Sequence, residues 1–136
     1  MTERDGGTVR DFEEKYLRLR SEAARSVREA AMGSDVPNGY TGIEQADHIA
    51  ERLRLSSEDI LLDLGSGRGW PGGRIAQRTG CRVVSTDLPL VALGPARRHW
   101  DDALGVGRML TVCADGRLLP FRDRAVHAVT HADVLC

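Results

Sequence analysis

The sequence predicts an α/β protein with a Rossmann-like parallel sheet, and two observations support this prediction. From residue 60 onward, short apolar runs alternate with longer amphipathic segments over short connections. Such alternation is typical of βαβ units, whose strands lie parallel in one sheet with helices on both faces. The first apolar run also leads directly into three closely spaced glycines, as strands do at the ligand-binding edge of such sheets.

The same pattern sets the expected strands and helices of this part. Four apolar runs indicate strands, at residues 60–64, 82–86, 109–114 and 125–130, the last extending to Leu135. A helix is expected over 71–79, with Pro71 in its first turn. A second helix is expected over 89–103, and because Gly94-Pro95 lies inside it, we expect a kink or a late start there.

Two helices are expected before the first strand. Residues 11–32 carry apolar side chains at steps of three or four without Gly or Pro, which indicates one amphipathic helix. A break over 33–39 separates it from a second helix, whose start is marked by a capping box of Thr41 and Glu44. We therefore divide the chain into two parts, an N-terminal helical segment, 1–39, and a sheet-bearing part, 40–136.

Composition and charge restrict the classes of function. The formal net charge of −1 gives no support for a general nucleic-acid or membrane-surface role. No apolar run approaches the roughly 20 residues of a membrane-spanning helix, and the polar N-terminus lacks the apolar core of a secretory signal, so we expect a cytoplasmic protein. The cysteines, Cys81, Cys113 and Cys136, show no metal-ligand spacing; we expect buried, reduced thiols and nominate no metal ligand.

Glycine and acidic residues recur at the expected carboxyl ends of the strands. Gly65, Gly67 and Gly69 follow the first strand, so the backbone can turn sharply beneath a ligand. Asp87 ends the second strand about 20 residues beyond this loop, where a carboxylate can accept hydrogen bonds from both hydroxyls of a ribose. Asp115 ends the third strand, where it can accept from an adenine amino group. Singly these residues are common turn signals, but together they predict a site for a nucleotide-like cofactor.

The main alternative is a dinucleotide site. The segment Gly67–Gly72 matches the G-x-G-x-x-G fingerprint, and Asp87 suits the ribose of NAD equally well. However, the match begins two residues late and places Pro71 inside the phosphate-binding turn. Asp63, just before the loop, would repel a pyrophosphate but suits an ammonium or sulfonium charge. The sequence therefore favours S-adenosylmethionine, and it excludes a P-loop because no Gly-Lys followed by Ser or Thr succeeds the glycines.

At these residues the chain resembles class I S-adenosylmethionine-dependent methyltransferases, particularly those that methylate small molecules at C, N or O. The resemblance covers about residues 40–136 and rests on four motifs in order, Leu61–Gly69, Val84–Leu88, Cys113–Phe121 and Ala125–Leu135. It implies that the second part of the chain is the cofactor-binding part of such a domain. It also implies a partial Rossmann-like sheet of about four strands in the order 3-2-1-4.

The resemblance implies roles for individual residues toward S-adenosylmethionine. The implied contacts are Asp63 near the amino group through water, Gly65, Ser66 and Gly67 along the methionine moiety, Asp87 at the ribose, Leu88 against the adenine ring, Asp115 and Gly116 at the adenine edge, and His131 near the methionine portion. Tyr40 and Gln45 are weaker candidates, on the helix that covers the cofactor. No catalytic residue is nominated.

The implied activity is methyl transfer from S-adenosylmethionine to a small-molecule acceptor. In that family the sheet continues beyond the fourth strand and builds much of the substrate pocket there. Because this sequence ends after its fourth strand, we expect an exposed apolar edge that pairs with a second copy or a partner chain. The alternatives are a non-catalytic or partner-completed S-adenosylmethionine-binding module and, from another class, an NAD-dependent Rossmann protein.

Overall fold

The structure, a computed structural model, describes residues 8–32 and 39–134. The elements in these two ranges are, in chain order, α1 (Val9–Arg18), α2 (Glu22–Met32), α3 (Ile43–Leu53), β1 (Ile60–Leu64), α4 (Gly72–Thr79), β2 (Arg82–Asp87), α5 (Leu90–Leu104), β3 (Met109–Cys113) and β4 (Ala128–His131). Within the same ranges, no helix is long and apolar enough to cross a membrane.

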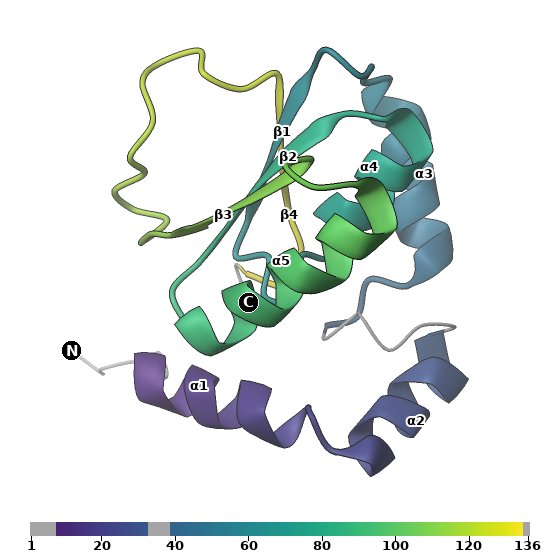
Figure 1. Cartoon of the computed structure of the whole chain (residues 1–136), viewed down its shortest axis with the longest axis vertical. Coiled ribbons are helices and arrows are strands. Elements are labelled where there is room, and N and C mark those ends of the chain that lie inside the picture. Colours follow the sequence, from purple (N-terminus) through teal and green to yellow (C-terminus); the bar gives the residue numbers. More distant parts are fainter. Residues whose placement is uncertain (1–7, 33–38, 135–136) are drawn as a thin grey trace, which may run out of the picture.

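The four strands form one parallel sheet in the order β3-β2-β1-β4, which confirms the predicted fold class and strand order. β1 lies in the middle, with Leu64 opposite both Thr86 of β2 and His131 of β4. Because all the strands run in one direction, their carboxyl ends meet at one edge of the sheet. The glycine loop after β1 therefore lies beside the ends of β2 and β4 (Figure 1).

One face of the sheet packs against helices and forms the hydrophobic core. Leu61, Val83 and Met109 are neighbours across three strands and are almost completely buried. Ile75 of α4 and Trp100 of α5 belong to the same buried cluster. Each fully buried side chain of this size contributes about 1.5–3 kcal/mol to folding, so this face holds the sheet and the helices together.

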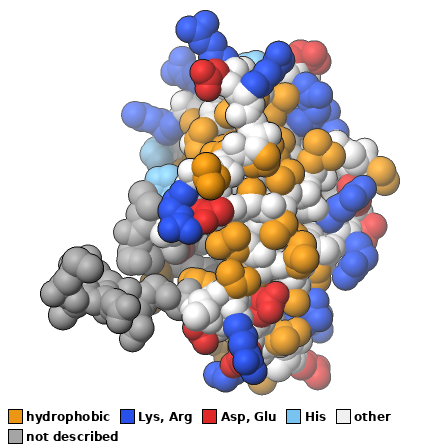
Figure 2. Space-filling view, turned by 90° about the vertical axis from the view of Figure 1, so that its left-hand side faces the viewer, with side chains coloured by type: hydrophobic (Ala, Val, Ile, Leu, Met, Phe, Trp, Pro, Cys, Tyr) orange, Lys and Arg blue, Asp and Glu red, His pale blue; other side chains and the backbone are white. Residues whose placement is uncertain are grey.

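The opposite face of the sheet carries the alternate residues of the strands. Leu110 of β3 and Val129 of β4 point there and are about half exposed, at 54% and 52%. Figure 2 shows hydrophobic side chains spread over the middle of the surface that it views. The described helices α4 and α5 both cover the core face, because successive right-handed crossovers from β1 to β2 to β3 proceed in one direction along the sheet.

The prediction of one continuous helix over residues 11–32 was wrong. The chain forms α1 and α2, separated by a short turn at Leu19–Ser21. The Ser21 hydroxyl accepts from the Ala24 amide at 3.2 Å, and Arg28 donates to the Leu19 carbonyl at 2.9 Å. These side-chain bonds satisfy backbone groups that a continuous helix would pair internally, and the turn contains neither Gly nor Pro to reveal it.

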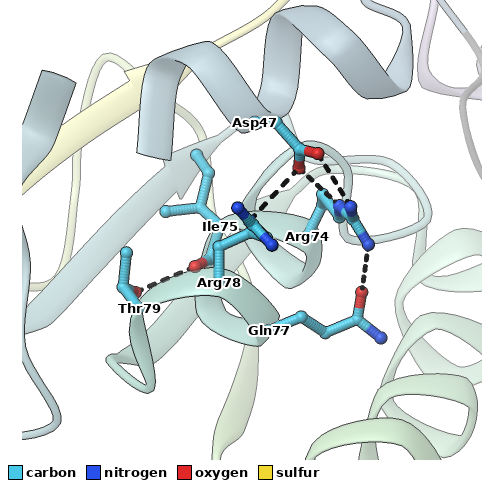
Figure 3. Close-up of polar contacts among 6 residues, drawn as sticks. All are labelled: Asp47, Arg74, Ile75, Gln77, Arg78 and Thr79. Atoms are coloured by element: carbon cyan, nitrogen blue, oxygen red, sulfur yellow. Dashed lines mark hydrogen bonds and ion pairs between the residues drawn. The ribbon is translucent and has the colours of Figure 1, made fainter. Parts of the chain in front are cut away.

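The start of α3 lies one residue later than predicted. Its N-cap is Gly42, whose amide donates to the Gln45 side chain at 2.9 Å, so Thr41 and Glu44 do not form the capping box. Asp47 then joins α3 to α4 through two hydrogen bonds from Arg74, at 2.6 and 2.8 Å, with Arg78 3.9 Å away (Figure 3). This bidentate ion pair fixes how α3 lies against α4.

Helix α5 runs from Leu90 to Leu104 with Pro95 inside it, so of the two expected effects, a kink or a late start, the late start does not occur. Proline has no amide hydrogen, so the carbonyl of Val91 lacks its usual partner in the helix. Arg20 donates to that carbonyl at 3.2 Å. A side chain from the turn after α1 thus replaces the missing hydrogen bond and links the N-terminal helices to α5.

Strand β4 is shorter than predicted, since it begins at Ala128 rather than at residue 125. Just before it, His127 closes against the start of β1: its amide donates to the Ile60 carbonyl at 2.8 Å, and its Nδ1 accepts from the Ile60 amide at 2.9 Å. The predicted extension of this strand was wrong as far as Val134, since β4 ends at His131 and residues 132–134 form a loop; Leu135 lies outside the described residues. Cys81 is buried as expected, Cys113 is exposed, which corrects the prediction, and Cys136 also lies outside.

Gly73 provides a test of the core. A Cβ at this position would overlap the buried indole of Trp100. We expect Gly73→Ala to lower the free energy of unfolding by about 1–3 kcal/mol in urea titrations. Gly42→Ala is the control, since nothing lies within 4 Å of its added Cβ; it should cost less than about 1 kcal/mol. Equal losses for the two variants would contradict this packing.

Candidate functional site

A cavity of about 660 Å³ lies at the carboxyl edge of the sheet, between the strand ends and α1. Its lining is mostly apolar and aromatic, with one lysine and two carboxylates among the described residues. The lining residues are Phe12, Lys15, Tyr16, Gly39, Tyr40, Gly65, Ser66, Trp70, Asp87, Leu88, Pro89, Ala132, Asp133 and Val134. Both tyrosines of the sequence, one of its two tryptophans and one of its two phenylalanines are among them.

The glycine loop forms the floor of this cavity. Gly65, Gly67 and Gly69 all have positive φ angles, 65°, 54° and 81°, which side-chain-bearing residues rarely adopt. Ser66, between the first two, is buried; its amide donates to the Thr86 carbonyl at 2.9 Å, and its hydroxyl is hydrogen-bonded to Ser85. These bonds to β2 hold the loop close to the neighbouring strand end.

Asp87 is the residue that the loop and β2 position most tightly. One carboxylate oxygen accepts from the Gly67 amide at 2.6 Å, and the other accepts from the Leu88 amide at 2.8 Å. The Tyr16 side chain from α1 is also hydrogen-bonded to Asp87. Burial raises the pKa of the Asp87 carboxyl, and these three hydrogen bonds act in the opposite direction. The carboxylate is therefore half-buried, oriented and on the cavity wall.

Asp63 lies beneath the loop rather than on the cavity wall, and no part of its surface is exposed. One carboxylate oxygen accepts from the Gly72 amide at 2.8 Å, in the first turn of α4. The other oxygen, Oδ1, has no hydrogen-bond partner in the structure. Burial raises the pKa of the Asp63 carboxyl to about 7, with a smaller contribution from the charge of Asp87 and an opposing one from the Gly72 hydrogen bond.

Asp115 is engaged by its own neighbour. Arg117 donates to both of its carboxylate oxygens, at 2.6 to 3.1 Å, and the Arg117 amide donates to it as well. Hydrogen bonds from the Arg117 side chain hold the pKa of the Asp115 carboxyl at about 2. Asp115 does not line the cavity, and neither do Gly116 nor His131.

The structure therefore brings together part of the predicted set. Gly65, Ser66, Asp87, Leu88 and the weaker candidate Tyr40 line the cavity. Asp63 and Gly67 lie below the cavity and support it through the bonds described above. Gln45 accepts from the Gly42 amide at the N-terminus of α3. The binding roles of the predicted residues stay predictions.

Besides Gly39, Trp70 and Pro89, two groups of lining residues were not predicted from the sequence. Phe12, Lys15 and Tyr16 lie at helical spacing on one side of α1. The apolar spacing that includes Phe12 and Tyr16 predicted an amphipathic helix, but it did not indicate a binding site. The second group is the loop after β4, Ala132 to Val134, which the sequence placed in the fourth motif as part of a strand and not as site residues. Both groups reach the site because α1 lies against the edge of the sheet at which β4 ends.

The arrangement suits an elongated ligand with apolar rings and a hydroxyl-bearing centre. Aromatic walls favour flat or cationic groups, and the oriented Asp87 carboxylate can accept from hydroxyls. Within residues 8–32 and 39–134, no group of three or more His, Cys, Asp or Glu side chains is arranged to hold a metal ion.

Comparison with known proteins gives two similar curated sequences, while no protein-family model matches the chain. Sterol 24-C-methyltransferase of Eremothecium gossypii is 31% identical over 93 residues, covering 65% of this chain and 24% of that protein. Malonyl-acyl carrier protein O-methyltransferase of Gallionella capsiferriformans is 34% identical over 73 residues, covering 51% and 25%. The chain thus spans about a quarter of the length of these curated relatives.

The fold has similar solved structures as well. The crystal structure of the 4+2 cyclase SpnF aligns with 90% of this chain and 48% of its own, with a TM-score of 0.72 and 22% identity. At this identity the likeness shows the fold alone. Fold and cavity define a Rossmann-like α/β protein with its site at the carboxyl edge of the sheet. In sequence and in fold, the chain resembles class I S-adenosylmethionine-dependent methyltransferases as far as the fourth strand of their sheet.

The raised pKa of Asp63 predicts a dependence of stability on pH. Because the folded pKa of about 7 lies above the unfolded value near 3.8, the stabilising contribution is complete below about pH 4 and is lost as the pH rises through 7. Urea titrations of wild type and Asp63→Asn from pH 4 to 8 measure the free energy of unfolding of each protein as a function of pH. The wild type should lose stability relative to the variant as the pH rises; a difference that is constant with pH would contradict the prediction.

Proposed function

We propose that this chain binds S-adenosylmethionine at the carboxyl edge of its sheet and transfers the methyl group to a small-molecule acceptor. The observation that carries the proposal is Asp87, held on the cavity wall by the Gly67 and Leu88 amides beside a loop of three left-handed glycines. Activity, acceptor and partners of the protein are part of this proposal, because the chain spans about a quarter of its curated relatives.

The residues of the site fit the chemistry of the cofactor. A carboxylate offers about four lone-pair positions, and the two backbone bonds to Asp87 leave room for ribose hydroxyls once Tyr16 moves. The unpartnered Oδ1 of buried Asp63 is an acceptor without a donor, which suits the amino group of the methionine moiety through a water molecule. Gly65 and Ser66 provide the floor for that moiety.

The adenine end is proposed from the sequence resemblance. Leu88, on the cavity wall and 39% exposed, offers an apolar surface for one face of the ring. Asp115 and Gly116 lie at the end of β3, and for Asp115 to accept from the adenine amino group it must share its oxygens with Arg117. We retain His131, at the end of β4, as a proposed neighbour of the methionine portion.

The bound cofactor would supply an electrophilic methyl group, and the protein's task is to align an acceptor with it and exclude water. The aromatic walls from α1 and from Tyr40 and Trp70 suit that task, since they give an acceptor a dry, apolar surface. The curated relatives are named for a sterol and for malonyl-acyl carrier protein, which supports a small-molecule acceptor here.

A dinucleotide is the less favoured ligand for a physical reason. In dinucleotide-binding folds the pyrophosphate sits at the N-terminus of the helix after the glycine loop. In this chain the Gly72 amide in the first turn of α4 already donates to Asp63, and a second carboxylate, Asp87, lies nearby. Two acidic groups at this position disfavour phosphates.

The second candidate function is a binding module that does not catalyse transfer. The observation in its favour is the fold likeness to SpnF, which is named as a cyclase, so this fold alone does not specify methyl transfer. Turnover assays with radiolabelled S-adenosylmethionine over a panel of small acceptors separate the two. Methylated product supports the enzyme, and binding without product across the panel supports the module.

Asp87→Asn tests the proposed ribose contact. The substitution removes the charged acceptor, which is worth roughly 1.5–3 kcal/mol, so we expect S-adenosylmethionine affinity to fall about 10- to 100-fold in calorimetry. Asp102→Asn, an exposed acidic residue on α5, is the matched control and should bind like wild type. Unchanged affinity in Asp87→Asn would show that Asp87 does not bind the ribose. Tight binding of NAD by wild type would favour the dinucleotide alternative.

We further propose that the β4 edge of the sheet pairs with a second copy of the chain or with another chain. β4 has a neighbour on one side within the described residues, and Val129 on it is about half exposed. Open strand edges with apolar side chains are prone to pairing. The cytoplasmic location and the division at residue 40 likewise remain proposals, drawn from the sequence.

Sedimentation velocity tests this pairing. Wild type should associate as its concentration is raised, and Val129→Lys should weaken the association at least about tenfold by placing a charge on the paired strand. Val106→Lys is the matched control, because Val106 is 85% exposed in the turn before β3. A wild-type protein that stays monomeric at high concentration contradicts the proposal.

A further inference from the structure

The loop after β4 contains an aspartate in an unusual backbone conformation. Asp133 has a φ of 57°, one of three described residues other than glycine with a positive φ. Aspartate and asparagine tolerate this left-handed region better than other side chains do, but it remains sparsely populated. Residues held there often cluster at functional sites, where the surrounding structure fixes them. Asp133 lines the cavity, so its conformation bears on the shape of the site.

The left-handed turn aims the Asp133 carboxylate at a distant part of the chain. Its Oδ2 accepts from the Tyr40 amide at 2.8 Å, across 93 residues of sequence. The approach depends on Gly39, because a Cβ there would overlap this carboxylate. This hydrogen bond from a backbone amide to a side-chain oxygen ties the two segments together.

The same loop also touches the floor of the cavity. Val134, next to Asp133, packs so closely on Gly65 that a Cβ at Gly65 would overlap its side chain. On the other side, the Trp70 indole donates to the Thr41 carbonyl at 2.7 Å. The segment before α3 is thus tied to the post-β4 loop through Tyr40 and to the glycine-loop side through Thr41.

We propose that Asp133 is a positioning residue for the cofactor site: its carboxylate holds the Gly39–Tyr40 segment over the glycine loop and so sets the wall from which Tyr40 closes on the bound ligand. The inference rests on the proposed function and goes beyond it by assigning a role to Asp133, a residue of the fourth motif for which the sequence analysis proposed no role. Tyr40 is 88% exposed, so its ring is free to fold onto a ligand while its backbone stays fixed by Asp133.

Two substitutions distinguish the role of the Asp133 side-chain acceptor from the role of its backbone conformation. Asp133→Gly keeps the left-handed turn without strain but removes the acceptor. Asp133→Asn keeps both, since asparagine tolerates positive φ and its side-chain oxygen can accept from the Tyr40 amide. If Asp133 acts by positioning, the asparagine variant should resemble wild type and the glycine variant should not.

Hydrogen exchange of the Tyr40 amide and calorimetry with S-adenosylmethionine are the two measurements. In Asp133→Gly we expect Tyr40 exchange to accelerate at least about tenfold and cofactor affinity to fall about tenfold. In Asp133→Asn both should stay within about threefold of wild type. Gly39→Ala, which pushes the carboxylate away from the opposite side, should reproduce the glycine variant, while Gly42→Ala, with open space around its Cβ, should not.

The outcomes decide between this role and its alternatives. Combining Gly39→Ala with Asp133→Gly should add little to the effect of either single change, because both remove the same contact, the hydrogen bond from the Tyr40 amide to Asp133. Wild-type affinity in Asp133→Gly overturns the proposal, and so does an equal loss in Asp133→Asn, since the charge itself would then be what matters. If wild type fails to bind S-adenosylmethionine, the proposed function is wrong; Tyr40 exchange then still tests the tie, and exchange unchanged in Asp133→Gly overturns the positioning role independently.

Discussion

The carboxylate of Asp63 lies below the glycine loop with no exposed surface, and its bond to the Gly72 amide joins β1 to the first turn of α4. Gly72 must lack a side chain for this contact, because a Cβ there would approach the carboxylate to 2.6 Å. The loop between these two residues is therefore fixed at both ends. Between these ends the loop contains the left-handed glycines Gly65, Gly67 and Gly69, and the Gly67 amide donates to Asp87.

The constraint also explains the electrostatics of the site. A buried carboxylate with one unpartnered oxygen is costly to ionise, which is why its pKa lies far above the usual value for an aspartate. A positive group arriving near the loop relieves this cost, whereas a phosphate increases it. The interior of the fold thus favours a cationic ligand before any residue of the cavity wall contributes.

Around this centre, long-range ties complete the cavity. Tyr16 reaches Asp87 from α1, Arg20 supplies the hydrogen bond that Pro95 cannot, and Asp133 fixes the Tyr40 amide. Each tie joins parts of the chain separated by about 70 to 90 residues, and each ends on a backbone group or a carboxylate. The N-terminal helices and the post-β4 loop are thereby part of the site rather than appendages to the sheet.

Local patterns in the sequence predicted most of the fold. Apolar runs marked the four strands, Pro71 marked the start of α4, and the spacing of Gly65 and Asp87 indicated two adjacent strand ends. The sequence predictions failed where no local residue marks the boundary of a helix. The turn at Leu19–Ser21 contains no Gly or Pro, and the N-cap of α3 is Gly42 because the Gln45 side chain accepts from its amide.

The amino-acid sequence alone was enough to place most strands and helices along the chain and to gather glycines and acids at one edge of the sheet, since periodicity and turn chemistry are local properties. Tertiary structure alone decided which side chains share the cavity. In the sequence, Phe12 and Tyr16 were only part of the apolar spacing of a helix, and the packing of α1 at the strand ends brought them and Lys15 to the cavity; Asp115 is paired with Arg117 and does not line the cavity. The reason is that lining a cavity and filling a core demand the same helical spacing, and only the packing of distant segments distinguishes them.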